Sequence, residues 1–141
     1  MLASRITLEQ NHDHSYLKVL EILQFIESAL SKIHWAHEPA ANRTHGSFIG
    51  LQRLVESFRK TSSDAELVAS LKQLVKPRNR FAHTYRLEHF FAQLNGLSDY
   101  ELFDKTVYLM ELHAKAEGLL TKVLRTLRSI ENSHAKNRHM R

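Results

Sequence analysis

The chain has 141 residues, enough for one domain with its own core, and none of them is cysteine, which excludes thiol catalysis, disulfides and thiolate metal sites. The formal net charge is +5, and the residues from 120 onward account for it. Such a basic end can attract nucleic acid or can simply stay solvated. No apolar run reaches the length of a membrane span, and the N-terminus lacks a signal-peptide core. A cytoplasmic protein without membrane contact is therefore expected.

Apolar residues recur at helical spacing along most of the chain, while four glycines and two prolines are few, and this combination favours helices. A capping-box pattern at Thr7–Gln10 predicts a long helix from about Leu8 to Ala36. A loop is expected over Glu38–Gly46, where a proline disfavours helix. Shorter helices are expected from about Phe48 to Lys60 and from about Ser63 to Pro77.

Two further helices complete the predicted chain. One runs from about Pro77 to Leu94 and stops at Asn95–Gly96, a good C-terminal signal. Another capping box, at Ser98–Glu101, opens a last helix from about Asp99 to Glu131. The residues expected on the buried faces of these two helices are Phe81, Phe90, Phe91 and Leu94, and then Phe103, Val107, Met110, Ala114, Leu120, Leu124 and Leu127.

These elements predict an all-α, up-down bundle of about five helices in a single domain, residues 1–131. The long first and last helices are expected to pack antiparallel. Residues 132–141 are expected to form a polar, basic tail.

The densest group of reactive side chains is the segment Arg78–Tyr85, which directly follows Pro77. A helix that starts at Pro77 would leave backbone N–H groups free to attract a phosphate, whereas one helix kinked at Pro77 would do so less well. Arginine binds phosphate bidentately, and histidine titrates near neutrality. Together they suit cleavage of RNA by its own 2′-hydroxyl, with His83 as general base and Arg78 stabilising the charge at phosphorus.

Helix geometry places Asn79 and His83 on one face, because they are four residues apart. Arg78 and His83 are instead about 140° apart around the axis. Either Arg78 reaches over the helix end, or it pairs with His83 of a second subunit. Four basic residues surround the segment and form either an RNA-binding cleft or a solvated face; they are Lys72, Lys76, Arg80 and Arg86.

The pattern Arg78-Asn79-x-x-x-His83 resembles the R-x4–6-H signature of HEPN domains, which are bundles of four to five helices. The continuation to Tyr85 matches the R-x4-H-x-Y form of HEPN toxins that are paired with minimal nucleotidyltransferase antitoxins. The resemblance implies a metal-independent endoribonuclease, a toxin or defence factor, whose homodimer brings two motifs into one cleft. Arg78 and His83 would be the catalytic pair, with Asn79 as their polar assistant. Tyr85 would be the position that the antitoxin modifies with AMP.

Two alternatives to an RNA-cleaving enzyme remain, an interaction module and a metal site. Many HEPN domains do not cleave RNA, so the rival function is an interaction module that binds nucleotide, RNA or a partner protein. His34, His37 and Glu38 could also place metal ligands on one helix, but a third well-placed ligand is lacking. The run His12–His14 can be merely solvated. No metal and no cofactor are therefore expected.

Overall fold

The structure is a computed structural model that describes residues 4–38 and 49–139. Within these ranges the chain forms helices and no strands, so the prediction of an all-α fold is confirmed. There are six helices in the described chain, because the segment expected to form a single helix after Pro77 forms two. They are α1 Arg5–His37, α2 Leu51–Thr61, α3 Ala65–Lys72, α4 Val75–His83, α5 Tyr85–Leu94 and α6 Asp99–His139.

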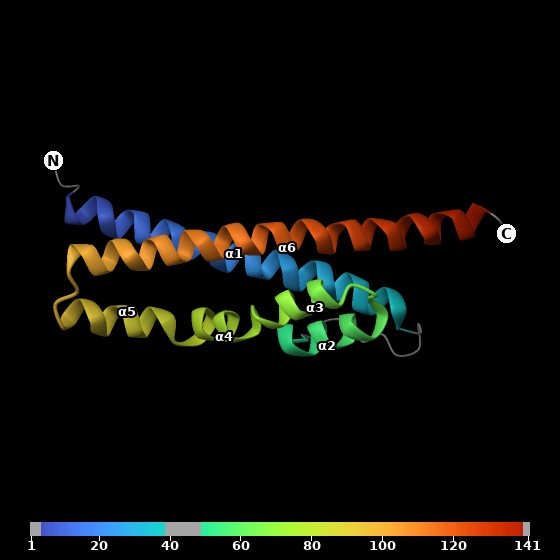
Figure 1. Ribbon diagram of the computed structural model, residues 1–141, viewed down its shortest axis with the longest axis horizontal. Helices are drawn as coiled ribbons and strands as arrows, with labels where there is room; N and C mark the ends of the chain where they lie inside the picture. The colour runs from blue at the N-terminus through green and yellow to red at the C-terminus, as the bar shows by residue number, and fades with distance from the viewer. Residues whose placement is uncertain (1–3, 39–48, 140–141) are drawn as a thin grey trace.

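The two long helices, α1 and α6, lie side by side and run in the same direction (Figure 1). Their N-terminal ends are tied by an ion pair, in which Nη1 of Arg5 lies 2.8 Å from Oδ1 of Asp99. The predicted antiparallel arrangement is therefore wrong. The physical reason is that α3, α4 and α5 run back along α1 one after another, so α6 starts again beside the start of α1 (Figure 1).

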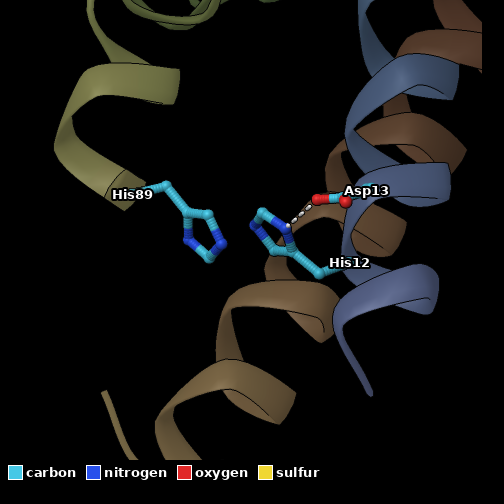
Figure 2. Close-up of side chains that lie close together, drawn as sticks. All are labelled: His12, Asp13 and His89. Carbon is cyan, nitrogen blue, oxygen red and sulfur yellow. Dashed lines mark hydrogen bonds and ion pairs between the residues drawn. The ribbon is translucent and has the colours of Figure 1, made fainter. Parts of the chain in front are cut away.

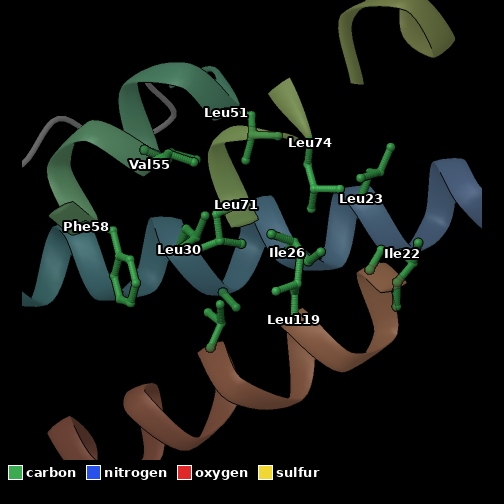
Figure 3. Close-up of a cluster of buried hydrophobic side chains, with 14 of the residues drawn as sticks. Ile22, Leu23, Ile26, Leu30, Leu51, Val55, Phe58, Leu71, Leu74 and Leu119 are labelled. Carbon is green, nitrogen blue, oxygen red and sulfur yellow. The ribbon is translucent and has the colours of Figure 1, made fainter. Parts of the chain in front are cut away.

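The core is built around α1. The helix α6 packs against one side of α1, and α2 and α3 pack against the other side (Figure 3). Leu23, Ile26 and Leu30 of α1 are almost completely buried, as the helical spacing predicts. Leu71 and Leu119 approach them from α3 and α6 (Figure 3). Truncation of such a core leucine to alanine typically costs about 2–5 kcal/mol, so this cluster fixes the scaffold on which the shorter helices lie.

The helix ends differ from several expected boundaries. Ser4, and not Thr7, caps α1, because the Ser4 hydroxyl accepts a hydrogen bond from the N–H of Thr7 at 3.2 Å. The expected cap of α6 is confirmed, since Oγ of Ser98 accepts from the N–H of Glu101 at 3.1 Å. The stop after α5 is also confirmed, with Gly96 in the left-handed region at φ 87°.

The expected end of the last helix at about Glu131 is wrong, because α6 continues to His139. Its last turns extend past the end of α1, so part of the basic tail is helical (Figure 1). The buried face expected for α6 is wrong in its first half, because Phe103 and Met110 are exposed whereas Leu102 and Leu109 beside them are buried. Leu127, near its other end, is buried as expected. The expected loop after Glu38 lies outside the described residues from position 39 onward.

Candidate functional site

The helix start expected at Pro77 lies two residues earlier. Leu74 is the N-cap of α4 and Val75 its first residue, which makes Pro77 the third. The N–H of Arg78 donates to the carbonyl of Leu74 at 2.9 Å, so it is not free to bind a phosphate. Proline tolerates this position because every N–H of the first turn lacks an intrahelical acceptor anyway. The predicted phosphate-binding helix start is therefore wrong.

Arg78 is directed toward the core helix. Its Nε atom forms an ion pair with Oε1 of Glu27 on α1, and the two side chains are only 17% and 9% exposed. The terminal nitrogens of the Arg78 guanidinium make no hydrogen bond to the described residues. Arg78 also lines a groove together with Gln24, Ser28 and Lys32 of α1. Arg78 thus links α4 to α1 through its Nε atom, and its two terminal nitrogens can donate to another partner.

Asn79 and His83 are exposed, and neither has a partner among the described residues. The buried residues of this part of the chain are Phe81, Tyr85 and His89, which follow one another at four-residue intervals. His83 is two residues beyond Phe81, about 200° around the helix, and so lies on the outward side. The structure therefore keeps Asn79 and His83 together and turns Arg78 toward α1.

The helix breaks directly after His83, at Thr84, whose backbone has φ −121° and ψ −24°. The hydroxyl of Tyr16 donates to the carbonyl of Phe81 at 2.7 Å, and thereby takes an acceptor that a continuous helix would use. The single helix predicted from Pro77 to Leu94 is thus wrong. The N–H groups of Thr84 and Glu88 still bond to carbonyls four residues earlier, so α5 continues the buried face of α4.

The four basic residues expected to bind RNA are all exposed, but they are not equally free. Arg80 pairs with Glu88, with Nε 2.9 Å from Oε2, and its guanidinium lies 5.3 Å from the ring centre of Tyr85. Lys72, Lys76 and Arg86 have no ion pair with the described residues. The structure thus leaves three unpaired cations near the motif, not four.

Tyr85 is almost completely buried, with 2% of its surface exposed. Its hydroxyl lies 2.6 Å from Nε2 of His12, and its ring stacks on Tyr16 with the ring centres 5.1 Å apart. Burial raises the pKa of the Tyr85 phenol well above its ordinary value. The candidate modification site is therefore a packed core residue in this conformation, and its hydroxyl is already bonded.

Around Tyr85 lies a cluster of buried polar groups that the sequence reasoning missed. His12, which the sequence allowed to be solvated, is 2% exposed, and its ring stacks on that of His89 with the centres 3.9 Å apart. Nζ of Lys105 lies 2.9 Å from Nδ1 of His89. One signal was present: His12 and His89 each stand four residues from a buried tyrosine, Tyr16 or Tyr85, and so share its helix face.

Burial lowers the pKa of both histidines of this cluster. For His12 the neighbouring Asp13 works in the opposite direction but does not outweigh burial. For His89 the nearby His12 lowers the pKa further. The pKa of Lys105 is lowered as well, first by burial and then by the charge of Arg80. At neutral pH both imidazoles are therefore uncharged.

The histidines first considered as metal ligands make other bonds. Nδ1 of His34 lies 2.6 Å from the hydroxyl of Ser57, and Nδ1 of His37 lies 2.9 Å from the carbonyl of Ile33. Across the described ranges, the one group with ligand atoms close enough for a metal ion consists of His12, Asp13 and His89 (Figure 2).

The chain matches no family model, no curated protein and no solved structure. Its function must therefore be argued from the site. None of the helices in the described residues has the length and apolarity needed to cross a bilayer.

Proposed function

We propose that the protein is a metal-independent endoribonuclease of the HEPN type that acts as a homodimer. The observation that carries this proposal is the state of Asn79 and His83, which are exposed and without partners in the described chain although they stand in a well-packed helical segment. An imidazole that is reachable from solvent suits a general base.

The proposed reaction needs one proton acceptor and one cation at the phosphate. His83 removes the proton of the RNA 2′-hydroxyl, and the 2′-oxygen attacks the adjacent phosphorus. The bond from phosphorus to the 5′-oxygen breaks, and this oxygen takes a proton from solvent. The products are a 2′,3′-cyclic phosphate and a 5′-hydroxyl. Arg78, through its terminal nitrogens, stabilises the charge that develops on the phosphate oxygens.

In this proposal a dimer brings Arg78 and His83 together, which one chain does not do. Within one chain Arg78 turns toward Glu27 of α1, while His83 lies on the outward side. Because the two groups face different directions, we place Arg78 of the partner subunit opposite His83. Asn79 shares the face of His83 and holds the bound phosphate or ribose by its amide. A two-fold axis then creates two identical sites.

A surface for this dimer runs along α5. Four large apolar side chains, here called the α5 stripe, are 52–66% exposed: Leu87, Phe90, Phe91 and Leu94. They expose on the order of 400 Å² per chain, which is the size of a functional surface patch and about half of what a standard interface buries per partner. Leu87 and Phe91 follow His83 at four-residue steps, so the stripe continues the face of the motif.

A toxin role, controlled by a nucleotidyltransferase antitoxin that modifies Tyr85, is part of the same proposal. It adds one requirement, since the Tyr85 hydroxyl is bonded to His12 in the folded chain. The phenol must leave this hydrogen bond before AMP can be attached. Modification would therefore open the packing between α1 and α5, and the silencing of the toxin would follow from that change.

The rival function is a non-catalytic module that binds nucleotide, RNA or a partner protein. The ion pair of Arg78 with Glu27 favours it, because a guanidinium that is held within its own chain has fewer donors for a substrate. The two functions differ in one readout, since only the enzyme shortens RNA.

The test is an incubation of purified protein with single-stranded RNA in EDTA, with analysis of the product ends. We expect cleavage that leaves 2′,3′-cyclic phosphate, and a loss of at least about 100-fold in His83→Ala, the usual contribution of a general base. His14→Ala, which removes an exposed histidine of α1, is the matched control and should cleave normally. RNA binding by the wild type without any cleavage would favour the module.

A further inference from the structure

One buried nitrogen in the histidine cluster has no hydrogen-bond partner. Nε2 of His89 makes no hydrogen bond, and no other buried side-chain nitrogen or oxygen of the described residues is in this state. His89 is 7% exposed, and its unpaired nitrogen is directed toward His12 (Figure 2). Buried polar atoms are nearly always satisfied, so an orphaned one calls for a bound water or ion.

Carboxylate oxygens of Asp13 and Glu9 and a ring nitrogen of His12 lie near this nitrogen. Nδ1 of His12 lies 3.2 Å from Oδ1 of Asp13, and Oε2 of Glu9 lies 3.6 Å from Nε2 of His89. One ring nitrogen of each histidine and an Asp13 oxygen all lie within 4.8 Å of one another. We propose that His12, Asp13 and His89, with Glu9 as the fourth ligand, bind one divalent transition-metal ion of the zinc type.

The donor set selects the class of metal. Two imidazole nitrogens with carboxylate oxygens suit zinc and its first-row neighbours, whereas magnesium and calcium prefer oxygen alone. Hydrogen bonds from Gln93 and Arg5 keep the pKa of Glu9 below its usual value although burial works to raise it. Two carboxylates therefore offset the charge of a dication in this partly buried place.

The second ring nitrogen of His12 is already placed as a metal-bound histidine needs it. When Nδ1 binds the ion, Nε2 carries the proton and donates to the Tyr85 hydroxyl, 2.6 Å away. Such outer hydrogen bonds hold the ring and its tautomer. The ligand atoms must also draw closer, because atoms bound to one tetrahedral zinc at about 2.0–2.1 Å lie roughly 3.4 Å apart. The two rings, now stacked with their planes 15° apart, must therefore rotate so that both nitrogens point at one ion.

Lys105 opposes the ion and so provides a sharp test. Its ammonium group lies 2.9 Å from Nδ1 of His89, where a metal-bound imidazole needs an acceptor instead of a donor. Lys105→Gln removes the positive charge and offers a carbonyl oxygen at the same place. This variant should bind zinc several-fold more tightly, a result that damage to the fold would not produce.

The experiment uses untagged protein, stripped with EDTA and exchanged into buffer, and titrates it with Zn²⁺ by calorimetry and with Co²⁺ by visible absorption. We expect one ion per chain and no response to Mg²⁺. Asp13→Asn should weaken binding at least about tenfold, and His89→Gln should abolish it. Asp13 is 71% exposed, so its variant should fold normally, which thermal unfolding checks. His14→Ala is the matched control and should bind as the wild type.

The outcomes separate the site from chance binding by the many histidines of the chain. Zinc binding that is the same in Asp13→Asn, His89→Gln, Lys105→Gln and the wild type would overturn the proposal. The absence of any zinc binding would also overturn it, and the partner of the buried His89 nitrogen would then be an ordinary water. The result is independent of the ribonuclease proposal, because RNA cleavage is assayed in EDTA and metal binding is read without RNA.

Discussion

The hydroxyl of Tyr85 lies 2.6 Å from Nε2 of His12, so the last residue of the segment Arg78–Tyr85 is bonded to the first helix. His12 is uncharged, because burial lowers its pKa. With its proton on Nδ1, beside the Asp13 carboxylate, its Nε2 accepts a hydrogen bond from the Tyr85 hydroxyl. Its other nitrogen, Nδ1, lies 3.2 Å from Oδ1 of Asp13. This chain of hydrogen bonds joins α5 to α1 just beyond the break at Thr84.

Removal of that hydroxyl tests its contribution to the fold. Tyr85→Phe leaves Nε2 of His12 buried without a partner, which should lower the free energy of unfolding by about 1–3 kcal/mol. Urea denaturation measures the change. Tyr100→Phe removes the hydroxyl of an exposed tyrosine and should stay within about 0.5 kcal/mol of the wild type. Equal effects of the two changes would contradict a structural role for the bond.

The ion pair of Arg78 with Glu27 gives a second prediction. Glu27→Gln leaves a largely buried guanidinium without its counter-charge, so the free energy of unfolding should fall by about 2 kcal/mol. Glu56→Gln is the matched control, because it breaks an ion pair with Arg59 at the exposed surface of α2, where such pairs contribute little. A loss in Glu27→Gln no larger than in the control would show that Arg78 does not depend on this pair.

The sequence predicted the helical class and most of the core of α1, because the apolar spacing of a helix buried on one side is strong and local. The sequence-based predictions were wrong where contacts between distant parts of the chain determine which residues are buried. Phe90, Phe91 and Leu94 were expected inside, yet all three are exposed, since the face of α5 is fixed by Tyr85 and His89. Hydrophobicity alone does not tell whether a helix face packs within the chain or stays exposed on its surface.

The candidate site was likewise predicted only in part from the sequence. Spacing alone showed that Arg78 and His83 do not share a helix face, and the structure turns Arg78 toward α1. Spacing could not reveal that Glu27 is the residue that meets it, because the two are 51 positions apart. The stacked pair of His12 and His89 was hidden for the same reason. A contact between distant helices leaves no periodic signal in either of them.

The proposed dimer site predicts that two inactive variants restore each other. Arg78→Ala and His83→Ala should each cleave RNA at least about 100-fold more slowly than the wild type. When they are mixed in equal amounts and allowed to exchange subunits, half of the dimers are mixed, and each of these holds one intact site. Activity should then return to about a quarter of the wild type. A mixture as inactive as its components would place both groups in one chain.

The α5 stripe predicts where the dimer can be broken. Phe91→Glu puts a charge into the proposed interface, so sedimentation velocity should show a monomer, and cleavage should fall with it. Phe91 is half exposed, so the melting temperature of the chain itself should change little. Phe25→Glu alters an equally exposed phenylalanine on α1 and should leave the dimer intact. A Phe91→Glu protein that still sediments as a dimer would move the interface elsewhere.

The buried histidines predict a dependence of stability on pH in metal-free protein. In the folded chain the pKa values of His12 and His89 are lowered, chiefly by burial, whereas in the unfolded chain they return to about 6.5. Below that pH the unfolded state binds more protons, so the free energy of unfolding should fall as the pH drops from about 7 to 5, a range above the carboxylate titrations.

Urea denaturation in EDTA across this range measures the slope. His89→Gln removes one of the two groups and should flatten the curve, while His14→Gln, at an exposed position, should leave it unchanged. A level curve would mean that burial does not lower the two pKa values, and stability that rises toward pH 5 would mean that both imidazoles are already protonated in the fold. In that state His12 could not accept the proton of Tyr85, and the hydrogen bond between them would have to run in the opposite direction.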